Sequence, residues 1–363
     1  MVSCLGQVYG NASSIHHFGQ TAKQRLEAAR RQLAALIHAN PAEIVFTGGG
    51  TEADNMAVLG AVRAANGRPS HVITSAIEHP AVLGPCAQLE REGVAVTRLR
   101  TGSSGVLNPD DLRRAMRPET VLVSVMHANN ELGTIQPIAE IARLAREAGV
   151  PLHVDGVQAL GKIPVDVDAL GVDLYSASAH KLYAPKGVGA LYVRKGTKLA
   201  PLTLGGHHER DRRPGTENVP GIAAFGAAAE LAGACLAADE ERLSALRDRL
   251  ETAVLDRIPG TGVNGSRWNR TPNTSNLYFD GIDGEALVIA LDLRGFAVST
   301  GAACSSGAIA PSHVLTAIGL DSDRARSSMR FSLGRANTAA QVDALVEALA
   351  ASVAHLRRIS VHA

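Results

Sequence analysis

Apolar segments of strand length alternate with helix-like segments over residues 21–193, and this alternation is the strongest constraint on the fold. Seven segments read as strands, at residues 43–47, 71–75, 94–99, 121–126, 151–154, 172–176 and 188–193. Helical patterns lie between them, at residues 21–37, 51–65, 81–92, 110–116 and 138–148. Strands and helices that alternate form parallel crossover units. The pattern therefore predicts an α/β fold, with a mostly parallel sheet flanked by helices.

The rhythm changes in the last third of the chain. A long helical stretch runs from Ile222 to about Arg257, and shorter apolar segments follow it at residues 275–279, 297–299 and 330–333. A further segment of unassigned type lies at residues 285–293, and a final helix is expected at residues 339–356. Because 363 residues exceed one ordinary hydrophobic core, we predict two domains. The large domain covers residues 1–235, and a smaller C-terminal α+β domain covers residues 236–363.

Composition narrows the function classes. The net charge is +1 and aromatic residues make up 3% of the chain, which gives no electrostatic or stacking platform for nucleic acid. No apolar run long enough to cross a bilayer is expected, and the first residues do not form a signal peptide. The four cysteines are far apart and form no CxxC pair, so no metal site is predicted and Cys86 and Cys235 are expected to be buried.

A lysine and an acid follow two neighbouring strands of the predicted sheet. Lys181 comes shortly after segment 172–176, among apolar and aromatic neighbours, and Asp155 follows segment 151–154. Burying an ammonium without a partner is costly, whereas a neutral amine in such a place can attack a carbonyl. A lysine and an acid at adjacent strand ends are what a pyridoxal phosphate site requires. Asp155 also fits a helix N-cap.

A glycine-rich turn, Gly48-Gly49-Gly50-Thr51, follows the first strand and opens a helix. Glycines let the backbone approach an anion, and free N–H groups at a helix start stabilise it. The same residues fit a plain turn with Thr51 as the N-cap. No Gly-Lys-Ser/Thr sequence follows, so the turn is not a Walker A loop.

Further polar residues follow other strands. The imidazole of His79 can stack on a planar ring or move a proton, and it can equally be structural. The amide of Asn130 can donate to a phenolic oxygen, although Asn129 and Asn130 also suit a turn. Gln158 is a second candidate for a ring oxygen, or an exposed helix residue. Five of these candidates lie at the carboxyl ends of successive strands, where open α/β sheets bind ligands. They are Thr51, His79, Asn130, Asp155 and Lys181.

Cys304 differs from the other cysteines. It lies in a stretch of small residues with flanking glycines, Gly301 and Gly307, so a mobile, exposed loop is expected. An exposed thiol is a liability unless it is used. The neighbouring sequence shows no positive residue that would lower its pKa.

These segments resemble those of a known family. The chain is similar to the cysteine desulfurases of the iron–sulfur-cluster type. These are pyridoxal phosphate enzymes of fold type I, with the class V aminotransferase fold. The matching motifs span almost the whole chain in order. They are Gly10-Asn11-Ala12-Ser13-Ser14, Gly50-Thr51-Glu52-Ala53-Asp54-Asn55, Glu78-His79, Asn129-Asn130-Glu131-Leu132-Gly133, Val154-Asp155-Gly156-Val157-Gln158, Ser178-Ala179-His180-Lys181, Arg213-Pro214-Gly215-Thr216-Glu217-Asn218, Ser299-Thr300-Gly301-Ala302-Ala303-Cys304 and Arg330-Phe331-Ser332-Leu333-Gly334.

The resemblance implies a role for each site residue. Lys181 would hold the cofactor covalently, and Cys304 would be the nucleophile that accepts sulfur. Arg330 would bind the substrate carboxylate with a two-pronged contact, beside Asn130. The remaining cofactor contacts would be His79 stacked on the ring, Asp155 at the ring nitrogen, Gln158 and Asn130 at the ring oxygen, and Gly50, Thr51, Ser178, His180 and Thr216 at the phosphate.

The resemblance also implies a reaction and partners. The enzyme would be a cytoplasmic transferase that takes sulfur from L-cysteine, leaves L-alanine and carries a persulfide on Cys304. Thr216 would reach the phosphate of a neighbouring subunit, which implies a homodimer. Sulfur acceptors would be an iron–sulfur scaffold or tRNA thiolation proteins. A selenocysteine lyase, a plain aminotransferase and a catalytically impaired scaffold homologue are the alternatives. The family's usual first strand, with its Asp-x-x-Ala-Thr-Thr segment, is expected to be missing.

Overall fold

The computed structural model describes residues 1–300 and 311–360, which fall into two compact units. The first unit consists of Met1–Leu99, Pro109–His127 and Gln136–Leu236. The second consists of Arg100–Asn108, Ala128–Ile135 and Ala237–Ala363. We expected one boundary, near residue 235. The structure divides the chain next to that position. Two short segments from the first half of the chain, Arg100–Asn108 and Ala128–Ile135, also belong to the second unit.

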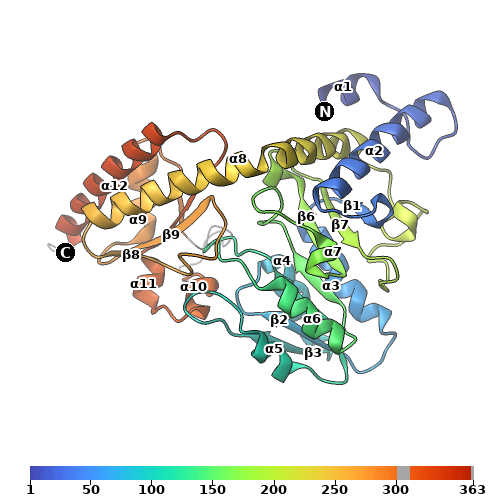
Figure 1. The fold of residues 1–363 in the computed structure, drawn as a ribbon, viewed down its shortest axis with the longest axis horizontal. Coiled ribbons are helices and arrows are strands. Elements are labelled where there is room, and N and C mark those ends of the chain that lie inside the picture. The colour runs from blue at the N-terminus through green and yellow to red at the C-terminus, as the bar shows by residue number, and fades with distance from the viewer. Residues whose placement is uncertain (301–310, 361–363) are drawn as a thin grey trace. The chain divides into compact units, whose positions relative to one another are not determined.

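A seven-stranded sheet forms the centre of the first unit (Figure 1). Its strands lie in the order β1-β7-β6-β5-β4-β2-β3. They are β1 (Ile44–Thr47), β2 (His71–Ser75), β3 (Ala95–Leu99), β4 (Thr120–Met126), β5 (Leu152–Asp155), β6 (Leu174–Ser178) and β7 (Gly189–Val193). The pairs from β3 to β6 are parallel, whereas β7 runs antiparallel to both β6 and β1. The predicted α/β class with a mostly parallel sheet is confirmed.

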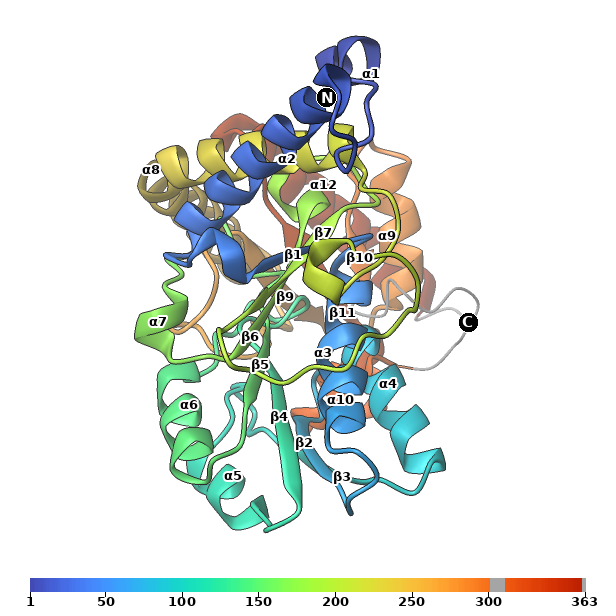
Figure 2. The ribbon, with the colours of Figure 1, turned by 90° about the vertical axis from the view of Figure 1, so that its right-hand side faces the viewer.

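Helices cover both faces of this sheet. They are α2 (His17–Leu36), α3 (Gly50–Ala64), α4 (Pro80–Arg91), α5 (Pro109–Ala115), α6 (Ile138–Glu147) and α7 (Val167–Leu170). Figure 2 shows α3 and α4 on one face, and α5, α6 and α7 on the other. Each of β1, β2, β5, β6 and β7 is buried along its whole length, because both of its faces are covered. Such strands read as continuous apolar runs, which is why the sequence revealed them.

The second unit contains a four-stranded antiparallel sheet in the order β10-β11-β9-β8. The strands are β8 (Thr261–Val263), β9 (Thr274–Phe279), β10 (Ser299–Thr300) and β11 (Ser328–Ser332). The helices are α9 (Gly284–Asp292), α10 (His313–Ala317), α11 (Ser322–Arg326) and α12 (Ala339–Ser360). Its core joins Leu250, Phe279, Leu287 and Leu349, all of them fully buried. The order of helices and antiparallel strands is that of an α+β unit.

Two helices are long and apolar enough to cross a membrane by length and composition, namely α8 (Val219–Arg257) and residues 339–359 of α12. This corrects the expectation that no such run occurs. Each helix buries a stripe rather than its whole surface, with Phe225, Ala229 and Ala232 on α8, and Leu349 and Val353 on α12. A stripe that repeats every three or four residues is typical of a helix packed on a protein core.

Short elements escaped the sequence analysis. The helix α1 (Val2–Gln7) lies where no helix was expected, and α7, α10 and α11 each span five residues or fewer. The three-residue strand β8 was missed as well. One or two helical turns carry too little periodicity to be recognised without their tertiary contacts.

A buried ion pair ties the exposed loop that precedes α8 to the sheet. Arg30 on α2 donates to both carboxylate oxygens of Glu209, at 2.8 and 2.7 Å, and the N–H of Phe46 in β1 donates to the same carboxylate at 2.8 Å. Glu209, Arg210 and Asp211 all have left-handed φ angles, 46°, 57° and 63°. This conformation costs roughly 1 kcal/mol or more for each non-glycine residue, so the buried contacts must offset it.

Replacing Glu209 by glutamine is expected to lower the free energy of unfolding by about 3 kcal/mol, because the buried guanidinium of Arg30 then keeps only the part-exposed carboxylate of Glu27 as a counter-charge. Urea unfolding followed by circular dichroism measures the change. Glu90→Gln is the matched control, since Glu90 makes the same two-pronged contact with Arg98, at 2.7 Å for each oxygen, in a half-exposed position. Its loss should cost less than about 1 kcal/mol. Equal effects of the two substitutions would contradict the prediction.

Candidate active site

The glycine-rich turn after β1 has the geometry of an anion site. Helix α3 begins at Gly50, and the N–H of Gly48 donates to the Oε2 atom of Glu52 at 2.7 Å. A Cβ atom added to Gly50 would lie 2.9 Å from Cγ2 of Val157 and 3.2 Å from Cβ of Ser178. The start of α3 therefore lies directly against the ends of β5 and β6. A fifteen-residue helix offers its first N–H groups and its dipole to an anion at this point.

Two of the predicted phosphate ligands meet beside this turn. The Oγ atom of Ser178, the last residue of β6, lies 2.9 Å from Nδ1 of His180. Ser178 is buried, whereas His180 and Thr51 are exposed. Burial and the positive charge of Lys181 lower the pKa of His180. A serine hydroxyl, an imidazole and helix N–H groups form a donor set that suits a phosphate.

Asp155 and Lys181 are brought together at neighbouring strand ends. Asp155 is the last residue of β5 and is 6% exposed, and its Oδ1 atom accepts from the N–H of Val157 at 2.9 Å. Burial raises the pKa of Asp155 to about 6, while that hydrogen bond and the charge of Lys181 oppose the rise. Lys181 is half-buried in the short helix Ala179–Leu182 that follows β6. The amine and the carboxylate thus lie within electrostatic reach of each other.

His79 and Gln158 belong to the same unit, and the side chain of each already makes a hydrogen bond within the protein. His79 caps helix α4, and its Nδ1 atom accepts from the N–H of Ala81 at 3.1 Å, which leaves Nε2 as the ring nitrogen that carries hydrogen in the neutral form. Gln158 accepts a hydrogen bond from Lys162. Both side chains are half-buried.

Buried polar residues beneath the site were missed by the sequence analysis. Asp54 on α3 and Glu78 after β2 are 1% and 0% exposed. Burial, together with the charge of Asp155, raises the pKa of Asp54 well above its ordinary value and that of Glu78 to about 8. His153 lies 3.5 Å from Asp54, and burial lowers its pKa to about 3. His153 precedes Asp155 by two residues, so the two share a face of β5, and this alternation was the available sequence signal.

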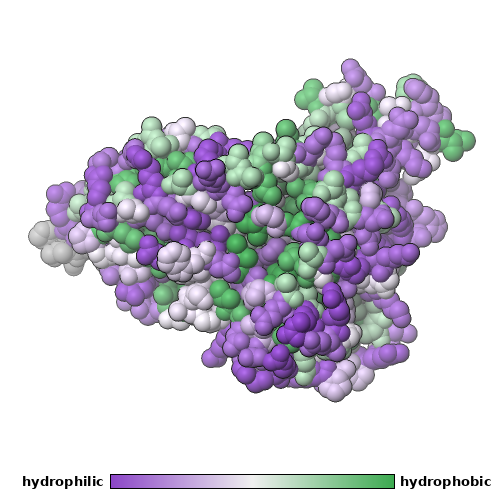
Figure 3. All heavy atoms as spheres, in the orientation of Figure 1, coloured by the Kyte–Doolittle hydropathy of each residue, from purple (hydrophilic) through white to green (hydrophobic). Residues whose placement is uncertain are grey.

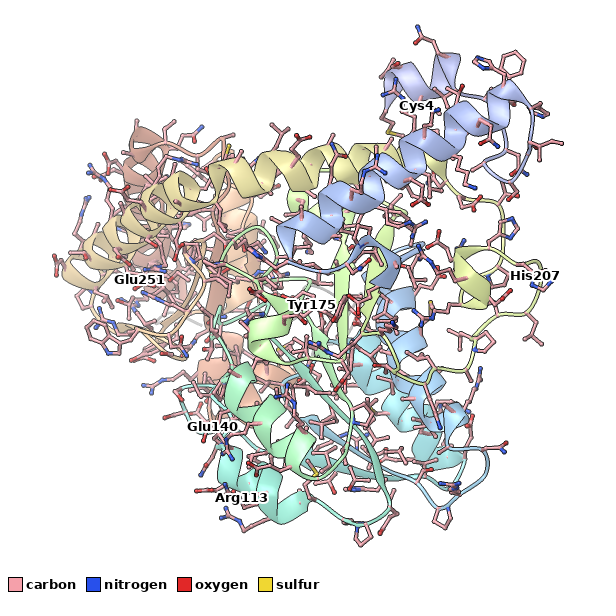
Figure 4. All side chains as sticks on the ribbon, turned by 45° about the vertical axis from the view of Figure 1, so that its right-hand side comes forward. Cys4, Arg113, Glu140, Tyr175, His207 and Glu251 are labelled. Atoms are coloured by element: carbon pink, nitrogen blue, oxygen red, sulfur yellow. The ribbon has the colours of Figure 1, made fainter. Side chains whose placement is uncertain are left out.

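A second buried histidine, His127, makes a hydrogen bond with the hydroxyl of Tyr175. The Nδ1 atom of His127 lies 3.0 Å from the hydroxyl of Tyr175, and burial lowers the pKa of His127 to about 4. Figure 4 shows Tyr175 in the middle of the first unit, whereas His207 projects from the outer loop. His207 pairs there with Asp211 in full exposure. The interior histidine is neutral at physiological pH and is a structural partner of the tyrosine.

Two of the predicted substrate residues lie in the second unit and touch each other. The Nη1 atom of Arg330 on β11 donates to the backbone oxygen of Asn130 at 3.1 Å. Asn129 is the turn former, because its Oδ1 atom accepts from the N–H groups of Glu131 and Leu132. The side chain of Asn130 is therefore not required by the turn.

Thr216 and the cysteines complete the set of predicted residues. Thr216 is exposed on the loop before α8, and Cys304 lies outside the described residues. Cys4 and Cys86 are buried, and burial raises the pKa of Cys86 to about 12. Cys235 is half-buried, which corrects the expectation that it is a core residue. On α8 its position faces partly outward.

The comparison with protein families identifies the class. A model of the aminotransferase class-V family matches residues 1–345. The chain belongs to the class-V aminotransferase family. Cysteine desulfurases and class-V aminotransferases in general depend on pyridoxal phosphate.

The curated relatives narrow the class. The chain is 48% identical over 356 residues to "Cysteine desulfurase IscS" of Dictyoglomus turgidum, covering 98% of this chain and 90% of the relative. It is 47% identical over 360 residues to the protein of the same name from Methanosarcina thermophila, covering 99% and 89%. The predicted resemblance to cysteine desulfurases is confirmed.

Solved structures agree. A "NifS-like protein" superposes with a TM-score of 0.92 at 35% identity, covering 98% of this chain and 94% of that one. "SspA in complex with cysteine" superposes with a TM-score of 0.80 at 36% identity, covering 91% and 92%.

Glu78→Gln is expected to stabilise the protein increasingly as the pH rises from 5.5 to 8. Between its ordinary pKa of 4.5 and its folded value of about 8, the buried carboxyl holds a proton that the unfolded chain has lost. The wild-type free energy of unfolding therefore falls with pH, by at most about 1.4 kcal/mol per unit from this group. The amide oxygen of glutamine can still accept from Ser75 and Met126.

Urea unfolding at pH 5.5 and 8 measures the difference between the two proteins. Glu92→Gln, which changes an exposed carboxylate in the same unit, should leave the wild-type pH dependence in place. A Glu78→Gln difference that is equal at both pH values would show that the carboxyl does not hold its proton.

Proposed function

We propose that this protein is a cysteine desulfurase that binds pyridoxal phosphate, removes sulfur from L-cysteine to give L-alanine, and carries the sulfur as a persulfide on Cys304. The observation that carries the proposal is the meeting of buried Asp155 with the charge of Lys181 at neighbouring strand ends. The relatives named as cysteine desulfurases, which match nearly the whole chain, support it.

The described residues fit the cofactor at both of its ends. The start of α3 at Gly50, where Val157 and Ser178 leave no room for a Cβ, and the Ser178–His180 pair would provide the phosphate cradle, with Thr51 at its rim. At the other end, Asp155 would hold the ring nitrogen. When bound, pyridoxal phosphate supplies an electron sink for the α-carbon of an amino acid. His79 would stack on the ring, and Gln158 and Asn130 would donate to its oxygen.

Each residue then has a defined task. Lys181 would hold the cofactor covalently, and its neutral amine would take the α-proton of the substrate. Asp155 keeps a proton on the ring nitrogen, because a buried carboxylate stabilises a cation strongly at low dielectric. Arg330 binds the substrate carboxylate through its free N–H groups, beside Asn130.

The sulfur step belongs to Cys304. Its thiolate forms an S–S bond to the substrate sulfur while the C–S bond breaks and the electron pair stays with the carbon, which is then protonated to alanine. The persulfide is passed to an acceptor of the iron–sulfur scaffold or tRNA thiolation kind. Such an enzyme operates in the reducing cytoplasm, where its thiol stays free.

The proposed homodimer has a surface available to it. Tyr9, Ile15 and Phe18 are 92%, 94% and 66% exposed. Figure 3 shows separate apolar groups among hydrophilic residues over α1 and the start of α2, at the upper right. Thr216 is exposed as well, as a residue must be that reaches the phosphate of a second subunit.

Lys181→Ala is expected to abolish covalent cofactor attachment and to lower the rate of sulfide release from L-cysteine by about 10³-fold or more, since it removes both the anchor and the base. Borohydride treatment followed by peptide mass analysis detects attachment, and sulfide release is measured in parallel. Lys186→Ala changes an exposed lysine five residues away and should keep both properties. Borohydride-stable attachment in Lys181→Ala would contradict the assignment.

Cys304→Ala is expected to keep the cofactor absorbance but to lose the protein-bound persulfide, because no other thiol replaces its role. The measurement is intact mass after a single turnover with L-cysteine, together with alanine formation. Cys235→Ala is the control, since it removes a half-buried thiol. Full-rate sulfide release by Cys304→Ala would rule out the thiol's role, and a faster reaction with selenocysteine than with cysteine would favour a selenocysteine lyase.

A further inference from the structure

Arg330 is held by a neutral contact and keeps hydrogen-bonding capacity. Its Nη1 atom donates to the carbonyl of Asn130 at 3.1 Å, and its buried Nε atom has no hydrogen-bond partner among the described residues. No carboxylate oxygen of residues 1–300 or 311–360 lies within 4.0 Å of its nitrogens. A half-buried guanidinium without a carboxylate partner is a site for an anion.

A buried carboxyl nevertheless lies next to it. Glu131, 4% exposed, adjoins Asn130 in the chain and feels the charge of Arg330, but its Oε2 atom accepts from the Oγ atom of Ser312 at 2.6 Å. Ser312 is itself fixed, because it caps helix α10 by accepting from the N–H groups of Val314 and Leu315. The carboxyl is thus turned to a hydroxyl rather than to the arginine.

The backbone around Glu131 is equally fixed. Asn129 accepts from the N–H of Glu131 at 2.8 Å, and Asn276 on β9 donates to its carbonyl at 3.3 Å. The position of the carboxyl relative to Arg330 is therefore set by contacts from three directions. All of these residues belong to the second unit.

We propose that Glu131 is a positioning residue that tunes the affinity of Arg330 for the carboxylate of the substrate, and that Ser312 holds Glu131 away from the guanidinium so that the arginine stays available. This inference rests on the proposed function, in which Arg330 binds that carboxylate. If Glu131 paired with Arg330, it would occupy the donors that the substrate needs. Held apart but ionised, it repels an anion bound at Arg330.

The charge of Glu131 changes within the physiological range. Burial raises the pKa of Glu131 to about 7, and the Ser312 hydrogen bond and the charge of Arg330 oppose the rise. Arg330, on β11, is the one charged group that shifts this pKa among the described residues. The groups that face it from α10 and β9, Ser312 and Asn276, are neutral. Carboxylate binding at Arg330 is therefore strongest below pH 7 and weakens above it.

The test uses propionate, a carboxylate without an amine, and the full chain loaded with pyridoxal phosphate. Its dissociation constant is measured by ligand-observed NMR at pH 6 and pH 8.5. Wild-type affinity should fall about five-fold over this range, whereas Glu131→Gln should bind with the tighter affinity at both pH values. In kinetics with L-cysteine, Glu131→Gln should lower KM at pH 8.5 and leave kcat nearly unchanged, which a general loss of structure would not do.

Ser312→Ala separates the hydroxyl's two contacts. It should weaken propionate binding at pH 8.5, where ionised Glu131 can turn to Arg330, but not at pH 6. The double variant with Glu131→Gln should regain the affinity of Glu131→Gln alone. A loss that is equal at both pH values and persists in the double variant would reduce Ser312 to a helix cap and overturn its proposed role.

Arg330→Ala distinguishes the two levels of the proposal. If it binds propionate as tightly as the wild type, Arg330 is not the carboxylate site, and both the substrate assignment and the inference fail. If it loses binding while Glu131→Gln keeps the wild-type pH dependence, the substrate assignment stands and only the role of Glu131 is overturned.

Discussion

A carboxylate buried at the end of a parallel strand is the constraint around which the first unit is organised. Asp155 costs free energy to bury, and the structure offsets that cost with the N–H of Val157 and the nearby charge of Lys181. Both residues end up at one edge because β5 and β6 run in the same direction. The start of α3 lies against the same edge, at Ser178. The shared direction of β5 and β6 therefore brings an acid, an amine and a helix N-terminus to one edge of the sheet.

The elements nearest this constraint could be predicted from the sequence. Buried parallel strands are continuous apolar runs, so β2 and β4 were located to within about a residue at each end. A charged residue just past such a run lies at the edge of the sheet. This is why Asp155 and Lys181 could be predicted to lie in the same site. The family resemblance added what spacing could not, namely the roles proposed for Thr216 and Cys304.

Features that depend on contacts distant in the sequence could not be predicted. The segment that forms β7 has the composition of a parallel strand, and only its pairing with β1 and β6 reveals that it runs the other way. The segment Ala128–Ile135 continues directly from β4 but belongs with the second unit, through contacts such as that of Asn130 with Arg330. The burial of Asp54 and Glu78 was not predicted, because it arises only when α3 packs on β5 and β2 pairs with β4.

The buried thiols have a consequence for an enzyme that handles reactive sulfur. Sulfane sulfur passes from thiolate to thiolate, so any second thiolate within the protein would divert it. Cys86 has its pKa raised to about 12 and is shut inside the first unit, and Cys4 is buried too. Neither thiol can therefore compete for the sulfane sulfur or be inactivated by it. Burial in the apolar interior thereby keeps these two thiols out of sulfur exchange, which is confined to cysteines that solvent can reach.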